Sequence, residues 1–215
     1  MRMRAIDFAE WVEKEIQSLS AEDFHLRTRK SKRLREELYP ISRLALLLKQ
    51  PGLEVLVEAH GPDGRVDARI YETGFRNRSF SVEATYAYDH EQSLRDELMV
   101  IDGVAPGSGP IARINRRIEA SPSAVDEDYH VLRIARMVAK CFREKTSKSY
   151  PSNTILIIAF EEITMRGWFA WIRFLGVLFE LINAAESSFL SVYLINVCSN
   201  EIQQISSSSY QNVDA

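Results

Sequence analysis

Apolar and polar residues alternate in three consecutive stretches of the first half of the chain. The stretches cover residues 53–60, about 65–73 and 79–88. Alternation of this kind is typical of strands that are buried on one face only. The sequence Gly-Pro-Asp-Gly at 61–64 and a short segment at 74–78 separate the stretches, which favours tight turns. The pattern therefore predicts an antiparallel three-strand meander.

Apolar residues recur with helical spacing in five other regions. These regions are residues 8–18, 34–48, 90–100, 126–148 and 168–184. Pro40 interrupts the second of them, so a kink or two consecutive helices are expected there. In the fourth region the apolar stripe consists of Val131, Ile134, Ala135, Val138, Cys141 and Phe142.

One stretch in the second half of the chain is apolar throughout. Residues 154–160 read Thr-Ile-Leu-Ile-Ile-Ala-Phe, which predicts a strand buried on both faces in the middle of a mixed sheet. A further strand is expected at 188–198, whereas 111–118 fits either a short helix or a strand. Residues 201–215 are polar and rich in serine, and they are predicted to form a flexible tail.

The length and net charge of the chain limit the kinds of protein that it can be. The 215 residues fit one domain, predicted to span residues 1–200 with N-terminal helices at 5–50 and a core at 51–200. A net charge of −3 argues against a generally cationic surface, so binding to a polyanion would need a local patch. The basic N-terminal residues are not followed by the apolar region of a signal peptide. The most apolar stretch, 167–183, contains an arginine and a glutamate and is too short to span a bilayer. A cytoplasmic location without membrane contact is therefore expected.

Two carboxylates fall on neighbouring strands of the predicted meander. Asp67 belongs to the second strand and Glu83 to the third. An antiparallel turn can bring them side by side, where like charges repel unless a cation, an arginine or a proton compensates. Mg²⁺, or Mn²⁺ in its place, suits such a pair together with a substrate phosphate. The alternative is a solvated face on which Arg65, Arg69 and Arg78 form ion pairs with the two acids.

The order of elements and the segment Glu83-Ala84-Thr85 resemble the restriction-endonuclease-like, or PD-(D/E)XK, nuclease superfamily. In that superfamily an acidic residue on the second strand precedes an (Asp/Glu)-X-Lys motif on the third, which would match Asp67 and Glu83. The resemblance implies an α/β (α+β) fold with a three-layer core, in which helices flank a mixed sheet containing the antiparallel meander. It also implies a Mg²⁺-dependent endonuclease, a hydrolase that cuts the phosphodiester bonds of nucleic acid.

Thr85 occupies the place of the lysine in that motif. The threonine hydroxyl carries no charge and is a poor base. No lysine lies between Lys49 and Lys140. The residues expected to help instead are Thr85 itself, His90 as a general base, or a lysine from another element. The alternative is a catalytically inactive domain of the same fold that binds nucleic acid or protein. A third hypothesis is an unrelated α/β interaction domain whose acids are only surface charge.

A further acid often comes from the first core helix of the superfamily. The resemblance therefore implies Glu37, or its neighbour Glu36, as a third metal ligand. For either residue the alternative is an ion pair on the helix surface with Lys32 or Arg33. Glu58 on the first strand of the meander is another acid expected near the site, or else on the solvated face.

The segment 27–35 contains six cations in nine residues. It is predicted to contact the phosphate backbone of nucleic acid through salt-sensitive, sequence-independent contacts. The residues predicted to make these contacts are Arg29, Lys30, Lys32 and Arg33. The alternative is a solvated helix face. The aromatic residues at 168–174 are expected in the core or in the interface of a homodimer.

Overall fold

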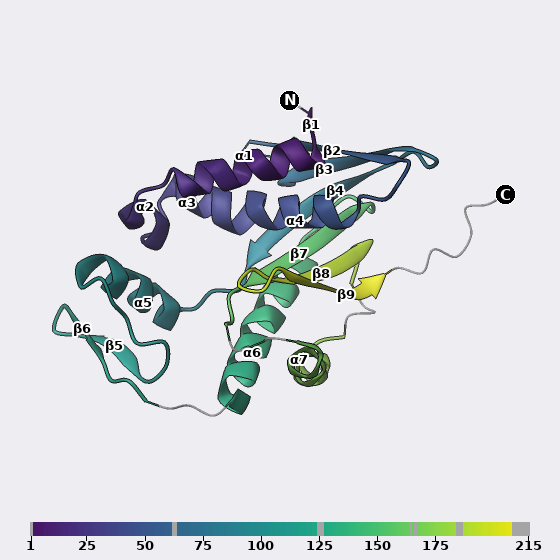
Figure 1. Cartoon of the computed structure of the whole chain (residues 1–215). Coiled ribbons are helices and arrows are strands. Elements are labelled where there is room, and N and C mark those ends of the chain that lie inside the picture. Colours follow the sequence, from purple (N-terminus) through teal and green to yellow (C-terminus); the bar gives the residue numbers. More distant parts are fainter. Residues whose placement is uncertain are drawn as a thin grey trace.

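The protein has a mixed α/β fold built on one seven-stranded sheet (Figure 1). The computed structural model describes residues 2–61, 64–123, 127–163, 165, 167–183 and 187–207. The strands of the main sheet follow the order β1-β2-β3-β4-β7-β8-β9. Their bounds are β1 Arg2–Arg4, β2 Leu53–Ala59, β3 Ala68–Gly74, β4 Arg78–Tyr86, β7 Thr154–Phe160, β8 Ser191–Asn196 and β9 Glu201–Ser207.

The sheet is antiparallel towards both edges and parallel in its middle. Strands β2, β3 and β4 form the predicted antiparallel meander. Strand β4 then pairs in parallel with β7, and β7 pairs in parallel with β8. Strands β1 and β9 add antiparallel pairs at the two edges. The expected mixed sheet with a meander is therefore confirmed.

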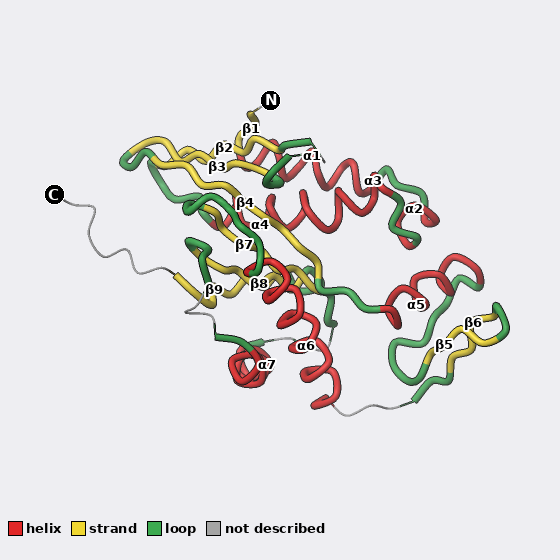
Figure 2. The backbone as a smooth tube through the Cα atoms, turned by 180° about the vertical axis from the view of Figure 1, so that it is seen from behind, coloured by secondary structure: helices red, strands yellow, loops and turns green. Residues whose placement is uncertain are grey.

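Helices cover both faces of the sheet, as the two opposite views show (Figures 1 and 2). The helices on one side are α1 Ala5–Gln17, α2 Ala21–His25, α3 Arg29–Lys32, the π-helix η1 Arg33–Leu38 and α4 Tyr39–Leu47. The helices on the other side are α6 Glu127–Thr146 and α7 Trp168–Leu181. In the described part of the chain, none of the helices has the length and apolar character needed to span a bilayer.

Strand β7 is buried on both faces and divides the core in two. Ile155 and Ile157 pack towards α1, η1 and α4, whereas Leu156 and Ile158 pack towards α6 and α7. A strand covered on both sides has no face for polar residues, which explains its unbroken apolar sequence. The prediction for residues 154–160 is confirmed with the same bounds.

The long helical region at 34–48 is divided, as Pro40 suggested. Pro40 is the second residue of α4, directly after η1. Proline lacks the amide hydrogen, and its ring clashes with the carbonyl one turn earlier in an α-helix, so a wider π turn accommodates it. Turns of this kind occur frequently at functional sites, and η1 carries Glu37.

The two edge strands β1 and β9 differ from the sequence prediction. Strand β9 falls within 201–215, where a flexible tail was expected, and it pairs with β8 from Glu201 to Ser207. Ile202 packs against the core on one face of the sheet and Ile205 against the core on the other. The rest of the predicted tail, 208–215, lies outside the described residues.

A small hairpin stands apart from the main sheet. Strands β5 Ile111–Ile114 and β6 Arg117–Ala120 pair with each other. They pack on α5 His90–Ile101 through an apolar cluster of Leu94, Leu98 and Ile111. Of the two alternatives for residues 111–118, the strand is therefore the one observed.

Candidate functional site

Asp67 lies immediately before β3, where the ladder with β4 ends. Its Oδ2 accepts a hydrogen bond of 2.8 Å from the backbone N–H of Ala84. Its own backbone N–H donates to the carbonyl of Val82 at 3.0 Å, and its carbonyl accepts from the N–H of His60 at 2.8 Å. Backbone contacts to both neighbouring strands thus fix Asp67. Its other carboxylate oxygen, Oδ1, makes no hydrogen bond to the described residues.

Glu83 projects from β4 towards α6 and is only 8% exposed. Lys145, in the last turn of α6, donates to Glu83 Oε1 at 2.5 Å, and the Tyr150 hydroxyl donates to the same oxygen at 3.1 Å. The antiparallel register of β3 and β4, continued by one residue, places Asp67 opposite Glu83. Asp67 and Glu83, here called the acidic pair, therefore meet a lysine that lies 62 residues after Glu83.

Glu37 approaches the acidic pair from η1. Arg33, one turn earlier, places its Nε 3.9 Å from Glu37 Oε2. The neighbouring Glu36 instead pairs with Arg27 at 2.6 Å. The structure therefore separates the two candidate acids of the first core helix: Glu37 lies within electrostatic reach of Asp67, and Glu36 belongs to another ion pair.

Two carboxylates of the site, Asp67 and Glu37, carry raised pKa values. Burial raises the pKa of Asp67 to about 6, and the charge of Glu83 adds to this effect, while a backbone hydrogen bond and nearby cations oppose it. Burial likewise raises the pKa of Glu37 to about 7, and the charge of Asp67 is the next cause. Crowded carboxylates of this kind gain from a proton or a cation. The site is therefore short of positive charge even with Lys145 present.

Thr85, the residue in the position of the expected lysine, also faces α6. Its hydroxyl contacts the thiol of Cys141, one helical turn before Lys145. Two residues along a strand and four along a helix each cover about 6 Å. Thr85–Cys141 and Glu83–Lys145 are therefore successive contacts between the same strand and helix. The lysine in contact with Glu83 therefore comes from α6 and not from β4.

Sequence reasoning missed Lys145, although α6 carries a signal for it. The buried stripe of this helix includes Val138, and Cys141 packs beside it. Lys145 takes the next position of that stripe, seven residues after Val138 and four after Cys141. A charge on a buried stripe needs a partner of opposite sign. That requirement is what could have directed attention from α6 to Glu83.

Two other predicted residues lie away from the acidic pair. His90 is exposed at the first position of α5, after β4 has already ended. Glu58 accepts a hydrogen bond of 2.6 Å from the Tyr71 hydroxyl and pairs with Arg2 at 3.3 Å. Glu58 therefore belongs to a polar group on the outer strands β1, β2 and β3.

The contacts of the acidic pair differ from those expected for a solvated face. Arg78 pairs with the buried Glu72 at 2.5 Å, while Glu83 is bound by Lys145. Arg65 and Arg69 are exposed. The two acids thus sit in a partly enclosed site with a lysine rather than in an exposed row of arginine pairs.

The basic segment divides into buried and exposed cations. Arg27 is largely buried and pairs with Glu36 and Asp96, and Arg35 is buried and pairs with Glu161 at 2.9 Å. These two arginines hold the N-terminal helices to the rest of the domain. A solvated helix face is therefore an incomplete description of this segment.

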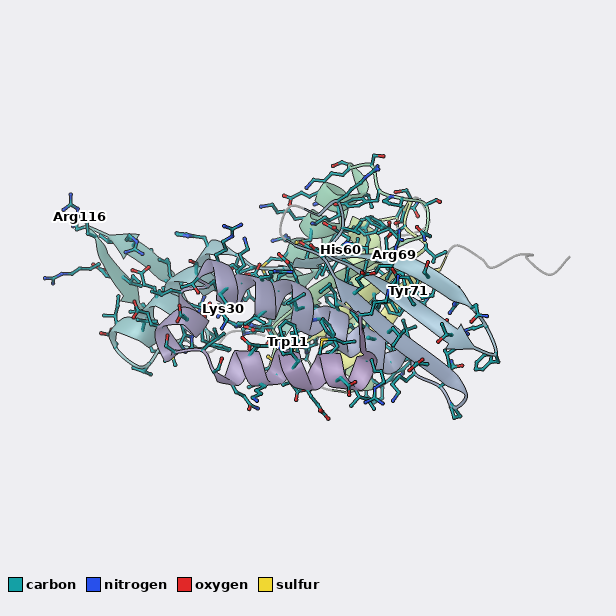
Figure 3. The ribbon with its side chains drawn as sticks, turned by 90° about the horizontal axis from the view of Figure 1, so that it is seen from above. Trp11, Lys30, His60, Arg69, Tyr71 and Arg116 are labelled. Carbon is teal, nitrogen blue, oxygen red and sulfur yellow. The ribbon has the colours of Figure 1, made fainter. Side chains whose placement is uncertain are left out.

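The remaining cations of the segment surround a hollow between α1 and η1. The hollow has a volume of about 670 Å³, and its lining includes Trp11, Arg29, Lys30, Lys32, Arg33 and Glu37. Figure 3 shows Trp11 and Lys30 on this helical layer of the molecule. All four residues predicted to contact nucleic acid thus line one hollow, whose lining also includes Glu37, a residue within electrostatic reach of Asp67.

The donor chemistry of the site fits a hard divalent cation with few protein ligands. Among the described residues, no group of three or more His, Cys, Asp or Glu side chains is placed to hold a metal ion. The third predicted ligand, Glu37, lies within electrostatic reach of Asp67. Mg²⁺ commonly takes one or two carboxylates and completes its shell with water and substrate phosphate. Asp67 offers a carboxylate oxygen without a hydrogen bond. The raised pKa of this residue is the electrostatic condition that a cation relieves.

The chain has no significant match among models of protein families, curated proteins or solved structures. Indications of function therefore come from the geometry of the acidic pair, Lys145 and the basic hollow.

The raised pKa of Asp67 gives a prediction for the variant Asp67→Asn. Because the pKa in the folded state, about 6, exceeds the ordinary value of 3.8, ionised Asp67 destabilises the fold. This penalty is absent below the ordinary value, grows as the pH rises and is complete above about 6. Asp67→Asn keeps an acceptor for the Ala84 N–H, so we expect it to raise the free energy of unfolding by up to about 3 kcal/mol near neutral pH.

Urea denaturation at neutral and at acidic pH measures this effect. The gain in unfolding free energy should nearly vanish at the acidic pH. Glu58→Gln is the matched control, because interactions with Tyr71 and Arg2 lower the pKa of Glu58 and its removal should give no gain. An equal gain for Asp67→Asn at both pH values, or none at either, would contradict the electrostatic description.

Proposed function

We propose that this chain is a metal-dependent nuclease with the restriction-endonuclease-like fold. The observation that carries the proposal is the contact of Lys145 with Glu83, opposite Asp67. Two carboxylates and a lysine are the groups that the (Asp/Glu)-X-Lys pattern brings together, and here the lysine comes from α6 instead of from β4. The strand order supports the same fold, since the meander β2–β4 continues through α6 into the parallel strands β7 and β8.

In this proposal each residue of the site has a distinct role. Asp67 and Glu83 would hold Mg²⁺ or Mn²⁺, and Glu37 would act on the site through its charge. A bound ion supplies two effects, polarisation of the phosphate and a lower pKa of a coordinated water. Lys145 places a positive charge beside Glu83, where it orients that carboxylate and stabilises negative charge that develops on the phosphate.

The proposed substrate is nucleic acid, because the hollow next to Glu37 collects cations on a chain of negative net charge. Arg29, Lys30 and Lys32 are exposed there, and Lys30 pairs with Glu15 at 3.0 Å across the hollow. Phosphates compete well for such exposed lysines, because surface ion pairs are weak. The contacts would be with the backbone and would carry no sequence information.

Calorimetric titration with Mn²⁺ or Mg²⁺ tests the metal site directly. Wild-type protein should bind the ion, and Asp67→Ala should lower the affinity at least tenfold because it removes one of two proposed ligands. The control is Glu58→Ala, which removes a strand carboxylate already engaged by Arg2 and Tyr71 and should leave the affinity unchanged. Wild-type protein that binds neither ion, with or without an oligonucleotide, would contradict the proposed enzyme.

A second candidate function is binding of nucleic acid without catalysis, by a domain of the same fold. It is favoured by the fact that Glu83 Oε1 already accepts from both Lys145 and Tyr150. In that case Lys145 takes the place of a metal ion, and the basic hollow works alone. Salt-dependent oligonucleotide binding that is indifferent to Mg²⁺, in a protein that cuts neither DNA nor RNA, distinguishes this function from the first.

A further inference from the structure

Helix α7 exposes a continuous row of large apolar side chains. Its inner residues Trp171, Phe174 and Leu178 are buried against α6 and the sheet. On the outer side, Phe169 is 86% exposed and Trp168 is 65% exposed. Ile172 and Phe179 on the same side are about half exposed. In Figure 1, α7 lies at the margin of the molecule, on the opposite side of the sheet from α1 and α4.

The apolar face of a helix is normally covered by another part of the protein or by a partner. Monomeric proteins rarely leave an apolar patch of this kind in contact with water, and such patches mark interaction surfaces. Trp168, Ile172, Leu175 and Phe179 follow one another at spacings of four, three and four residues. This is the spacing of a seam along which one helix packs against another.

Gly176 lies in the middle of this seam and has no explanation within the chain. Glycine lowers the stability of a helix interior relative to alanine. A Cβ atom at Gly176 would meet no other atom within 4 Å, so packing inside the molecule does not require glycine there. A glycine on an exposed helix face permits close approach of another backbone. A second helix crossing α7 at Gly176 would account for a glycine at this position.

The charges on either side of Gly176 indicate which helix this is. Arg173 comes three residues before Gly176 and Glu180 four residues after it, and both side chains are exposed. If α7 meets its own copy in antiparallel orientation, Arg173 of each copy approaches Glu180 of the other. A two-fold axis gives every such contact twice. The surface is thus complementary to itself in charge as well as in apolar character.

We propose that the chain forms a homodimer in which α7 packs antiparallel against α7 of a second copy, with Gly176 at the crossing point. This interface lies on the α6–α7 side of the sheet and leaves the basic hollow on the α1 side open (Figures 1 and 2). It is independent of the proposed nuclease activity.

Sedimentation equilibrium over a wide range of protein concentration tests the dimer. Wild-type protein should dimerise, and Phe169→Glu should weaken association at least tenfold by placing a charge beside the apolar seam, on the exposed face of α7. Phe75→Glu is the matched control, since Phe75 is a comparably exposed phenylalanine in the turn between β3 and β4 and should change nothing. A wild-type monomer at every concentration would overturn the proposal and would leave another protein, a lipid surface or residues 208–215 as the cover of α7.

Two further variants test the geometry of the pairing. Gly176→Leu should weaken the dimer, although it increases the helix propensity of α7. Arg173→Glu and Glu180→Arg should each weaken the dimer, and the double variant should restore it, because the charges then attract again in exchanged positions. Arg173 also pairs with Asp128 of its own chain, so Asp128→Asn serves as the control that should leave association unchanged. A dimer indifferent to all of these changes would overturn the antiparallel α7 interface.

Discussion

In the proposed nuclease, Lys145→Gln is expected to lower the rate of phosphodiester cleavage by about 100-fold or more at saturating metal and substrate. Removal of a single group that stabilises charge in a transition state typically costs a factor of about 100 to 1,000. Lys145 is the cation in direct contact with Glu83, and it is largely buried with it. Glutamine keeps most of the volume and hydrogen-bonding capacity of the side chain and removes its charge. The rate should be measured in single turnover with an end-labelled oligonucleotide.

Lys140→Gln is the matched control for this experiment. Lys140 lies on the same helix and is largely exposed, and its Nζ is 3.9 Å from Oε1 of Glu144. Its charge therefore faces solvent and Glu144 instead of the acidic pair. Its substitution should leave the cleavage rate within a factor of about two, in line with the small contribution of surface ion pairs. Thermal unfolding of both variants shows whether a lost rate reflects a lost fold. A folded Lys145→Gln variant that cuts as fast as the wild type would contradict the role of Lys145.

Neutralisation of the exposed cations in the hollow is expected to have the second large effect. The triple variant Arg29→Gln/Lys30→Gln/Lys32→Gln should weaken oligonucleotide binding by about 100-fold at low salt, at roughly 1 kcal/mol for each lost phosphate contact. The slope of log K against log salt should become shallower by roughly 0.7 to 0.9 for each contact. Fluorescence anisotropy in a salt series without metal ion measures both quantities, so the result does not depend on cleavage.

The hairpin β5–β6 provides the control of equal charge. Arg113, Arg116 and Arg117 also form a cluster of three cations, and Figure 3 shows Arg116 at the far tip of this hairpin. Substitution of all three arginines by glutamine removes the same amount of positive charge, but from a site outside the hollow. It should change affinity much less than the triple variant in the hollow. Equal losses for both variants would mean that net charge, and not the hollow, determines binding.

The sequence predicted the centre of the sheet well and its edges poorly. An unbroken apolar run is a local signal, and β7 appeared at residues 154–160 as expected. Strands β1 and β9 lack such a signal, because each has one neighbouring strand and a largely polar sequence. Strand β1 depends on hydrogen bonds offered by β2, which is distant in the sequence, and β9 depends on those offered by β8, the strand directly before it. Edge pairing of this kind cannot be read from local alternation.

The candidate site was predictable where it depends on a single local element. The alternation of the meander placed Asp67 opposite Glu83, and the register of β3 and β4 agrees with this placement. The contact of Glu83 with Lys145 depends on how α6 packs across β4, which no local pattern specifies. Thr85 stands where the resemblance expects a lysine, and the lysine that contacts Glu83 comes from α6 instead. The sequence signal for this contact is the position of Lys145 on the buried stripe of α6.

The most direct test of the proposed function is cleavage of labelled single- and double-stranded DNA and RNA by wild-type protein and by Glu83→Gln, each with Mg²⁺ or Mn²⁺ and with EDTA. If the acidic pair and Lys145 form a nuclease site, wild-type protein cuts at least one of these substrates with metal and none with EDTA, and Glu83→Gln cuts none. Cleavage that persists in EDTA or in Glu83→Gln, or a folded wild-type protein that cuts no substrate with either metal, would contradict the proposal.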